Sequence, residues 1–303
     1  MPGKTYLRRL RSLNEHLVLI DGFNLLSRAY FATSYGRDDH QLEKNSEGRY
    51  IHALKVFFSR ISNLQERFPG GIVIAWDGKR EDTIRNQDHQ FYKAQRKDLP
   101  APLIEQYHTA TEICTDMGMH QMQVAGYEAD DIIGSFTKAP LPVRKVIYSN
   151  DKDLFQLLNE DTDQLFVQKR KEIHYQLHHF QDDYGIQPAQ WIDVKALLGD
   201  PSDNIPGCPG VGAKAALPLI QLYGSVEGVY NQLEQLDPAF NRYRKKLENG
   251  RESVMISREL VEIHCGLDDV HAVDMETLRS PSQAQYINVL EHYEILKDPF
   301  KLS

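Results

Sequence analysis

Three short apolar runs that each lead to an acidic residue constrain the fold of this chain more than any other feature of its sequence. The runs occupy residues 16–21, 72–77 and 143–148. Apolar runs of this length, bounded by turn-forming residues, are typical of buried parallel strands. Residues 48–68 carry apolar side chains at helical spacing and end at Pro69-Gly70-Gly71. Strands separated by helical segments predict an α/β fold with a mostly parallel sheet.

The acids that end or follow these runs are Asp21, Asp77 and Asp151. A single acid in this position is usually a turn former or a helix cap. In a parallel sheet, however, the carboxyl ends of the strands meet at one edge, where binding sites form. Three acids after three strands therefore predict one shared site at this edge.

The stretch Gly126-Tyr-Glu-Ala-Asp-Asp131 places Glu128, Asp130 and Asp131 directly before an apolar run. This pattern predicts a loop that enters a helix, and the exposed N–H groups and dipole of a first helical turn favour acids. That effect accounts for one or two carboxylates, but three neighbouring like charges raise one another's pKa. We therefore expect a positive charge among them, and divalent cations are the usual partners of oxygen ligands.

A polar, basic stretch extends from Gly78 to about Pro102. Within it Lys93 and Arg96 are three residues apart, on one face if the segment is helical, and Tyr92 lies beside them. Paired cations next to an aromatic ring suit a nucleic-acid backbone and a stacked base. A solvated loop or a charged surface helix explains the same pattern.

Two more acidic pairs follow along the chain. Asp151 and Asp153 form a D-x-D pair, which is weakly specific because solvated turns carry it as well. Asp200 and Asp203 lie on a turn that follows a helix predicted over residues 188–198. Between the pairs, residues 165–167 and 173–175 flank Lys169-Arg170-Lys171 and predict a hairpin with a basic tip.

A glycine-rich loop follows the second acidic turn and precedes an alanine-rich helix. Its glycines are Gly207, Gly210 and Gly212, and Lys214 opens the helix. Consecutive N–H groups at a helix N-terminus bind anions, and a lysine adds charge. The loop therefore predicts a sequence-independent contact with a DNA phosphate. Cys208 is expected to be a small apolar filler, since no partner cysteine or histidine is near.

Composition excludes some classes of protein and leaves others open. A chain of 303 residues with 41% hydrophobic residues can form an α/β domain and a smaller appendage. No apolar run reaches the roughly 20 residues that a membrane helix needs, and three widely spaced cysteines predict a reducing cytoplasm. The net charge of −8 does not exclude nucleic acid, because about nine acids could surround cations in one site.

Taken in order, these motifs resemble the 5′-nuclease family, which includes the 5′-3′ exonuclease domain of bacterial DNA polymerase I, phage 5′-exonucleases and flap endonucleases. The resemblance extends from about His16 to Val270, and the absence of a polymerase domain after it predicts a stand-alone bacterial or phage member. Two residues depart from the family pattern. Ala215 replaces the usual threonine, and Pro218 falls inside the following helix, which we expect it to kink.

The resemblance implies a PIN-like α/β fold in which helices flank a mostly parallel central sheet, a helical arch and a helix-three-turn-helix subdomain that holds duplex DNA. The implied divisions are an N-terminal extension over 1–15, a catalytic domain over 16–185 with the arch at about 79–102, the DNA-binding subdomain over 186–270 and a C-terminal helical extension over 271–303.

The resemblance also implies roles for individual residues. Ligands of a first metal ion are Asp21, Asp77, Glu128 and Asp130, and those of a second are Asp131, Asp151, Asp153, Asp200 and Asp203. Lys93 and Arg96 match the arch cations that steer the scissile phosphate. The implied DNA contacts are Tyr92, Gly210, Gly212 and Lys214.

The implied activity is metal-dependent 5′-3′ exonuclease and 5′-flap endonuclease cleavage of DNA in replication and repair. The expected cofactors are two Mg²⁺ ions, with Mn²⁺ able to substitute, and K⁺ at the glycine loop. The expected partners are DNA with 5′ flaps, nicks or 5′ ends, bound by a monomer without a membrane. Two alternatives are a PIN-type ribonuclease, which also places carboxylates on a parallel sheet, and a catalytically silent protein that binds DNA junctions.

Overall fold

The structure is a computed structural model that describes residues 16–296, except for the side chains of Met275 and Glu276. The expected N-terminal extension and the last part of the expected C-terminal extension lie outside these residues. A six-stranded sheet forms the centre, with the strand order β3-β2-β1-β4-β5-β6. The strands are β1 His16–Asp21, β2 Gly70–Ala75, β3 His120–Met122, β4 Arg144–Tyr148, β5 Thr162–Gln168 and β6 Lys171–Tyr175.

Every neighbouring pair of strands is parallel except β5 and β6, which form an antiparallel hairpin. The predicted mostly parallel sheet is therefore confirmed. Side chains of β1 alternate between the two faces of the sheet, with Val18 and Ile20 in one hydrophobic cluster and Leu17 and Leu19 in another. Both faces are buried, which explains why the run is apolar throughout.

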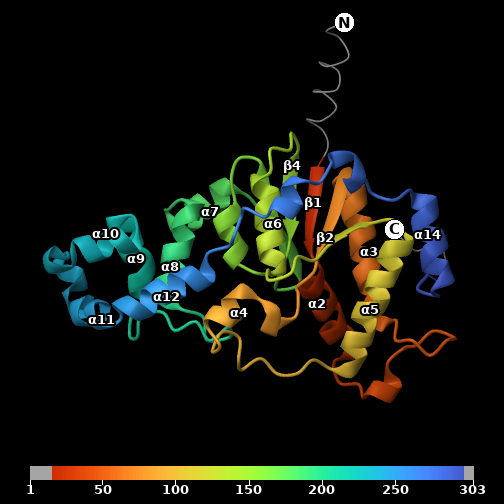
Figure 1. Ribbon diagram of the computed structural model, residues 1–303, viewed down its shortest axis with the longest axis horizontal. Helices are drawn as coiled ribbons and strands as arrows, with labels where there is room; N and C mark the ends of the chain where they lie inside the picture. The colour runs from red at the N-terminus through yellow and green to blue at the C-terminus, as the bar shows by residue number, and fades with distance from the viewer. Residues whose placement is uncertain (1–15, 297–303) are drawn as a thin grey trace, which may run out of the picture.

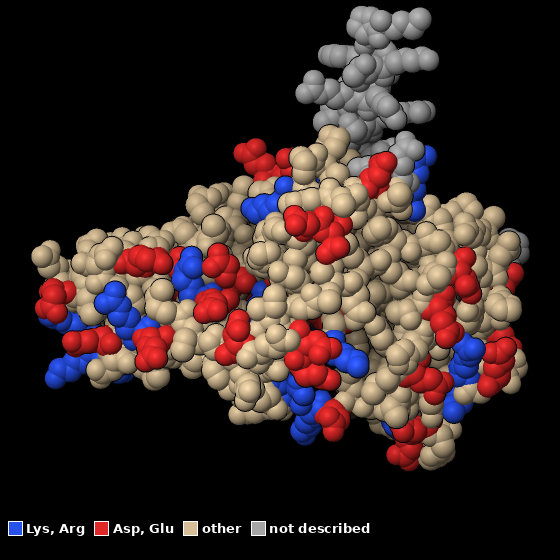
Figure 2. All heavy atoms as spheres, viewed as in Figure 1, with Lys and Arg blue, Asp and Glu red and all other residues tan. Residues whose placement is uncertain are grey.

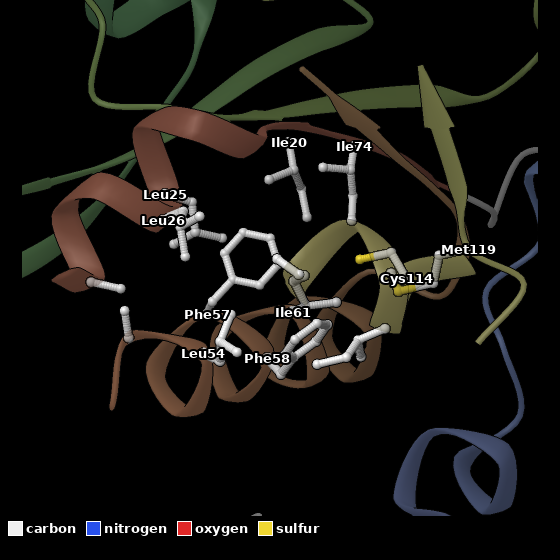
Figure 3. Packing of buried hydrophobic residues seen from close by; sticks show 14 of the residues in the cluster. Ile20, Leu25, Leu26, Leu54, Phe57, Phe58, Ile61, Ile74, Cys114 and Met119 are labelled. Carbon is white, nitrogen blue, oxygen red and sulfur yellow. The ribbon is translucent and has the colours of Figure 1, made fainter. Parts of the chain in front are cut away.

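Helices cover both faces of the sheet (Figure 1). One face packs against α2 Gly22–Ser34, α3 His52–Arg67, α5 Ala101–Asp116 and α14 Gln283–His292, the other against α6 Ala129–Lys138 and α13 Asp268–His271. Figure 3 shows the first of these cores, where Phe57 and Phe58 of α3 meet Ile20 and Ile74 of the sheet.

A helical subdomain extends from the β6 side of the sheet, at the left of Figure 1. It contains α7 Leu177–Tyr184, α8 Trp191–Leu198, α9 Ala213–Tyr223, α10 Val226–Asn231, α11 Arg244–Asn249 and α12 Arg251–Val261. Its core is continuous with the sheet, because Phe166 of β5 and Tyr175 of β6 belong to the same hydrophobic cluster as α8 and α9. Helix α9 continues through Pro218.

The basic segment after β2 contains little regular structure. Its helices are α4 Ile84–Asp88 and a short 3₁₀ turn at Arg80–Asp82, and the chain then runs without helix to α5. The turn around Lys93 is not helical, so the spacing of Lys93 and Arg96 does not place them on a helix face. None of the described helices is long and apolar enough to span a membrane.

Candidate active site

Asp21 and Asp77 lie together at the carboxyl edge of the sheet, as the sequence predicts. Asp21 caps α2, where its Oδ1 accepts a hydrogen bond from the Asn24 N–H at 3.0 Å, and its Oδ2 accepts one from the Ser149 hydroxyl at 2.9 Å. Asp77 accepts a hydrogen bond from the N–H of Ala129 at 2.9 Å. These bonds tie the ends of β1 and β2 to the loop after β4 and to the start of α6.

The surroundings of these two acids oppose their ionisation. Burial, followed by the nearby charge of Asp77, raises the pKa of Asp21 to about 7. Burial also raises the pKa of Asp77, against the hydrogen bond from Ala129. A cation bound between the two acids would offset the free-energy cost of ionising them.

Glu128 lies at the N-terminus of α6 and accepts three side-chain donors. Arg85 Nη1 lies 2.9 Å and the Tyr92 hydroxyl 3.0 Å from its Oε2, and Lys93 Nζ pairs with its Oε1. Burial alone would raise the pKa of Glu128, but the charges of Lys93 and Arg85 hold it below its ordinary value. Arg85 was not singled out from the sequence, although it is a basic residue within the 78–102 segment.

Asp130 and Asp131 differ sharply in their surroundings. Asp130 Oδ1 is buried without a hydrogen-bond partner, and the nearest cation, Arg85 Nη1, is 3.7 Å away. Burial and the charge of Asp131 raise the pKa of Asp130 well above its ordinary value. A buried carboxylate oxygen without a partner is unusual and indicates a ligand that completes it.

Both oxygens of Asp131 are already engaged. They accept two hydrogen bonds from Arg85, at 2.6 and 2.8 Å, and one each from the backbone N–H groups of His264 and Glu128. In this arrangement Asp131 fixes Arg85 beside Glu128 and does not present an oxygen for a metal ion, in contrast to the role expected of it. The physical reason is that Asp131 lies on the inner side of the first turn of α6, where it is 1% exposed.

The second acidic group joins the sheet to the helical subdomain. Lys195 Nζ of α8 lies 2.9 Å from Asp153 Oδ1 and 3.0 Å from Asp200 Oδ2. Burial and Asp151 raise the pKa of Asp153 to about 6, while Ser202 and Lys195 outweigh burial and lower the pKa of Asp200. Lys195 carries no signal in the sequence that marks it as a site residue, since it lies within the predicted helix, five residues before Asp200.

Asp151 completes this group at the end of β4. Its Oδ1 accepts the N–H of Asp153 at 2.8 Å, and its own N–H donates to the Ser149 hydroxyl that also contacts Asp21. Gln164 of β5 donates to the carbonyls of Ser149 and Asp151 and fixes this loop. Ser149 thus bridges the two acidic groups.

The basic segment crosses the site and contacts both groups. Arg96 donates to Asp203 Oδ1 at 2.7 and 3.1 Å, so Lys93 and Arg96 each pair with a carboxylate, one in each group. Tyr92 does not fit its expected role in this arrangement. Its side chain is 4% exposed and packs with Ile205 and Leu260, because its hydroxyl is drawn inward to Glu128, and a buried ring cannot stack on a base.

The donor set fits divalent cations chemically. Within residues 16–296 no three acids, histidines or cysteines converge on one point, since Lys93, Arg85, Arg96 and Lys195 pair with several of the acids. Asp130 Oδ1 nevertheless lacks a hydrogen bond, and the pKa values of Asp21, Asp77 and Asp153 are raised. A cation with oxygen ligands would satisfy this oxygen and favour the ionised carboxylates.

The glycine loop leads from Asp203 to α9. Gly199 and Gly207 both have positive φ and lie against each other, so a Cβ at either would come within 2.7 Å of the other's backbone. Gly212 precedes α9, and both Gly212 and Lys214 are exposed. Lys246 Nζ donates to the Gly210 carbonyl at 3.1 Å. On the visible face of the helical subdomain, at the left of Figure 2, Lys and Arg side chains are interspersed with acids.

An Asp21→Asn variant should become more stable relative to the wild type as pH rises, when both are measured in a chelator. The folded state raises the pKa of Asp21 to about 7 from 3.8, so ionisation between these values costs stability. Thermal unfolding should show little difference near pH 4 and a gain for the variant on the order of 4 kcal/mol near pH 7.5. Exposed Asp98→Asn is the control, and a difference that does not change with pH would contradict the prediction.

Comparison with known proteins agrees with this geometry. Residues 16–185 match the family described as "5′-3′ exonuclease, N-terminal resolvase-like domain", and residues 186–284 match "5′-3′ exonuclease, C-terminal SAM fold". A "5′-3′ exonuclease" of Halalkalibacterium halodurans is 52% identical, over 89% of this chain and 91% of that protein. One of Bacillus subtilis is 35% identical, over 84% and 85%. The T5 D15 protein, co-crystallized with metal ions, shares the fold with a TM-score of 0.67 at 22% identity, over 91% and 99%. The chain therefore belongs to the 5′-3′ exonuclease family.

Proposed function

We propose that the protein is a metal-dependent 5′-3′ exonuclease and structure-specific 5′-flap endonuclease that hydrolyses DNA phosphodiesters during replication and repair. The observation that carries the proposal is the buried oxygen of Asp130, which has no hydrogen-bond partner and lies among acids from three strand ends and α6, with Lys93 and Arg96 paired to two of the acids of the site. The relatives named 5′-3′ exonuclease support the activity. A related fold, the bacteriophage T5 D15 flap endonuclease, was solved with DNA and metal ions, which supports the substrate.

Two groups of acids would hold two Mg²⁺ ions, and Mn²⁺ should substitute. The first group is Asp21, Asp77, Glu128 and Asp130, and the second is Asp151, Asp153, Asp200 and Asp203. When bound there, the two ions would supply activation of a water molecule and stabilisation of the leaving oxygen in an in-line displacement. Asp131, in contrast, holds Arg85 in place and so keeps a permanent positive charge beside Glu128 and Asp130.

Lys93 and Arg96 would bind the scissile phosphate. Each pairs with an acid of a different group, so a phosphate between the groups lies within reach of both cations. Their charge would orient the phosphate and offset the negative charge that develops on it during cleavage. The segment that carries them is attached by Tyr92, whose ring is buried and whose hydroxyl donates to Glu128.

The glycine loop and the start of α9 would bind the phosphate backbone of the duplex. The exposed N-terminus of α9, with Gly212 and Lys214, supports this role. K⁺ bound at the loop would replace Lys246 as the partner of the Gly210 carbonyl. All parts of the site come from one chain, which supports a monomer, and the three free cysteines fit a reducing cytoplasm.

A substrate panel tests the proposed function. A 5′ flap, a nicked duplex, a single DNA strand and an RNA strand are each incubated with Mg²⁺ and, separately, with a chelator. We expect the enzyme to cleave flap and nicked DNA from the 5′ end in Mg²⁺, and we expect the chelator to abolish this cleavage. Preferential cleavage of RNA would favour the PIN-type ribonuclease, and tight junction binding without cleavage would favour the silent binding protein.

Gly212→Val should weaken duplex binding equally on all sequences. Gly212 has a φ of −102° and a Cβ there would meet nothing within 4 Å, so the fold accepts valine. The branched side chain would instead keep a phosphate away from the N–H groups of α9. Loss of one phosphate contact should flatten the slope of log affinity against log salt by about one unit.

The same variant separates the duplex contact from the chemistry. Short single strands need no duplex contact, so their cleavage should fall much less than cleavage of flaps. Gly266→Val provides a control outside the loop, because this exposed glycine between α12 and α13 has no positive φ and a Cβ there would make only ordinary contact with the His264 ring. An equal loss on both substrates would mean that the loop supports Asp200 and Asp203 and would refute the duplex-binding assignment.

A further inference from the structure

The hairpin between β5 and β6 carries three basic residues that the site described above does not use. Lys169 and Arg170 form its two-residue turn, and Lys171 opens β6 opposite Gln168. All three are exposed, and within residues 16–296 no hydrogen bond or ion pair involves their side chains. We propose that this tip is a second DNA contact, which binds the phosphate backbone of the substrate within a few nucleotides of the cut.

The position of the tip supports this assignment. β5 runs parallel to β4 and hence to β1, so the hairpin leaves the sheet at the edge where Asp21 and Asp151 lie. Its base is joined to the site, because the Asn150 side chain exchanges two hydrogen bonds of 2.8 Å with the backbone of Val167. Beyond Val167 only Gln168 precedes the two-residue turn, so the tip extends little past the base of the hairpin. Neighbouring strands are about 4.8 Å apart and a DNA strand advances about 3.4 Å per nucleotide, so the end of β5 lies within a few nucleotides of the acid that follows β4.

The backbone of the turn indicates that its side chains matter. Lys169 has a φ of 49° and Arg170 a φ of 65°, as in a type I′ turn, which asparagine followed by glycine adopts at lower free energy. A lysine–arginine pair is therefore a poor choice for the stability of the hairpin. The positive charge of Lys169 and Arg170 therefore explains their presence in this turn, whereas the backbone conformation does not.

The charge around the tip is also one-sided. The nearest acid of the hairpin, Glu172, is already paired with Arg60 and Arg67 of α3. The three basic residues of the tip and the two arginines of α3 together place five cations beside one acid, although the chain as a whole has a net charge of −8. Because the neighbouring acidic groups repel a polyanion, basic residues at the rim of the site would lower the cost of bringing a phosphate backbone to it. This inference rests on the proposed function, since it names a further contact of the same substrate.

Lys169→Asn/Arg170→Gly is the test variant. It removes two charges and gives the turn the residues that it prefers, so a loss of binding cannot be ascribed to a damaged hairpin. Its unfolding temperature should equal or exceed that of the wild type. Lys169→Arg/Arg170→Lys preserves the charge of the tip. Lys138→Gln, at the end of α6 that faces away from the acids, removes one charge elsewhere.

Single-turnover cleavage of a 5′ flap in Mg²⁺ is measured against enzyme concentration and salt. For the test variant the half-saturating concentration should rise about tenfold at 100 mM salt, with the maximal rate within twofold, and the salt slope should flatten by about one to two units. The two controls should resemble the wild type. If the test variant had the same half-saturating concentration and salt slope as the wild type, the proposal would be overturned. The basic tip would then be assigned to binding an acidic protein partner.

Neutral methylphosphonates locate the contact. Replacing single phosphates within a few nucleotides of the cut should weaken binding of the wild type at the contacted position and cause no further loss in the test variant. Equal losses in both proteins at every position would refute the contact. Should the wild type fail to cut any DNA, the proposed function fails, while fluorescence anisotropy with the same oligonucleotides still decides whether the tip binds DNA.

Discussion

Asp130→Ala is expected to reduce cleavage by about a thousandfold or more while duplex binding stays within a few fold. Asp130 presents a buried oxygen without a hydrogen-bond partner, and its raised pKa reflects burial and the charge of Asp131. Both features identify it as a group that requires a bound cation. It lies far from the glycine loop in sequence and contacts none of the residues assigned to the duplex.

Stability separates this prediction from simple damage to the fold. Removing a carboxylate from a repulsive cluster should raise the unfolding temperature of the protein in a chelator and reduce the further gain that Mg²⁺ provides. Calorimetry of Mg²⁺ binding should show weaker binding. A variant that cuts at close to the wild-type rate in Mg²⁺ would refute the metal assignment.

Lys93→Ala should lower the maximal rate of single-turnover cleavage by about a hundredfold or more and weaken DNA binding far less. Lys93 Nζ pairs with Glu128 inside the first acidic group, so its charge can act on a phosphate held there. The contact strengthens as charge develops on the phosphate, and for this reason the loss appears mainly in the rate.

Lys97→Ala is the matched control, because it removes an exposed lysine from the same segment. Its maximal rate should stay close to that of the wild type. If the defect of Lys93→Ala disappeared at saturating enzyme, Lys93 would be an ordinary binding contact and its assignment to catalysis would be wrong.

Much of the fold was predictable because β1 is buried on both faces and is apolar from Leu17 to Ile20, and because β4, after two basic residues, ends in the apolar sequence Val146-Ile147-Tyr148. The acids at the ends of β1, β2 and β4 were predictable for a related reason, since parallel strands end at one edge. β3, with the sequence His-Gln-Met, carries no such signal and was missed, although it pairs with β2. β2 also begins two residues earlier than its apolar run, at glycines that suggested a turn.

The pairing within the site was not predictable, because it depends on contacts between distant segments. Arg85 meets Asp131 across 46 positions of sequence, and Lys195 of α8 meets Asp153 after β4. Both cations look like ordinary surface residues of polar or helical stretches. Tyr92 was assigned to DNA because of its basic neighbours, and only the folded chain brings Ile205 and Leu260 around its ring.

The contact between Gly199 and Gly207 has a geometric consequence for the substrate. The backbones of these two glycines are in contact, so the ends of the loop between them are held together. Asp200 and Asp203 lie within this loop, and Gly212 follows it five residues after Gly207. The acids and the start of α9 therefore cannot separate independently. If the loop binds a phosphate of the duplex as proposed, this short, fixed span would set the length of duplex between that phosphate and the broken bond, whatever the length of the flap.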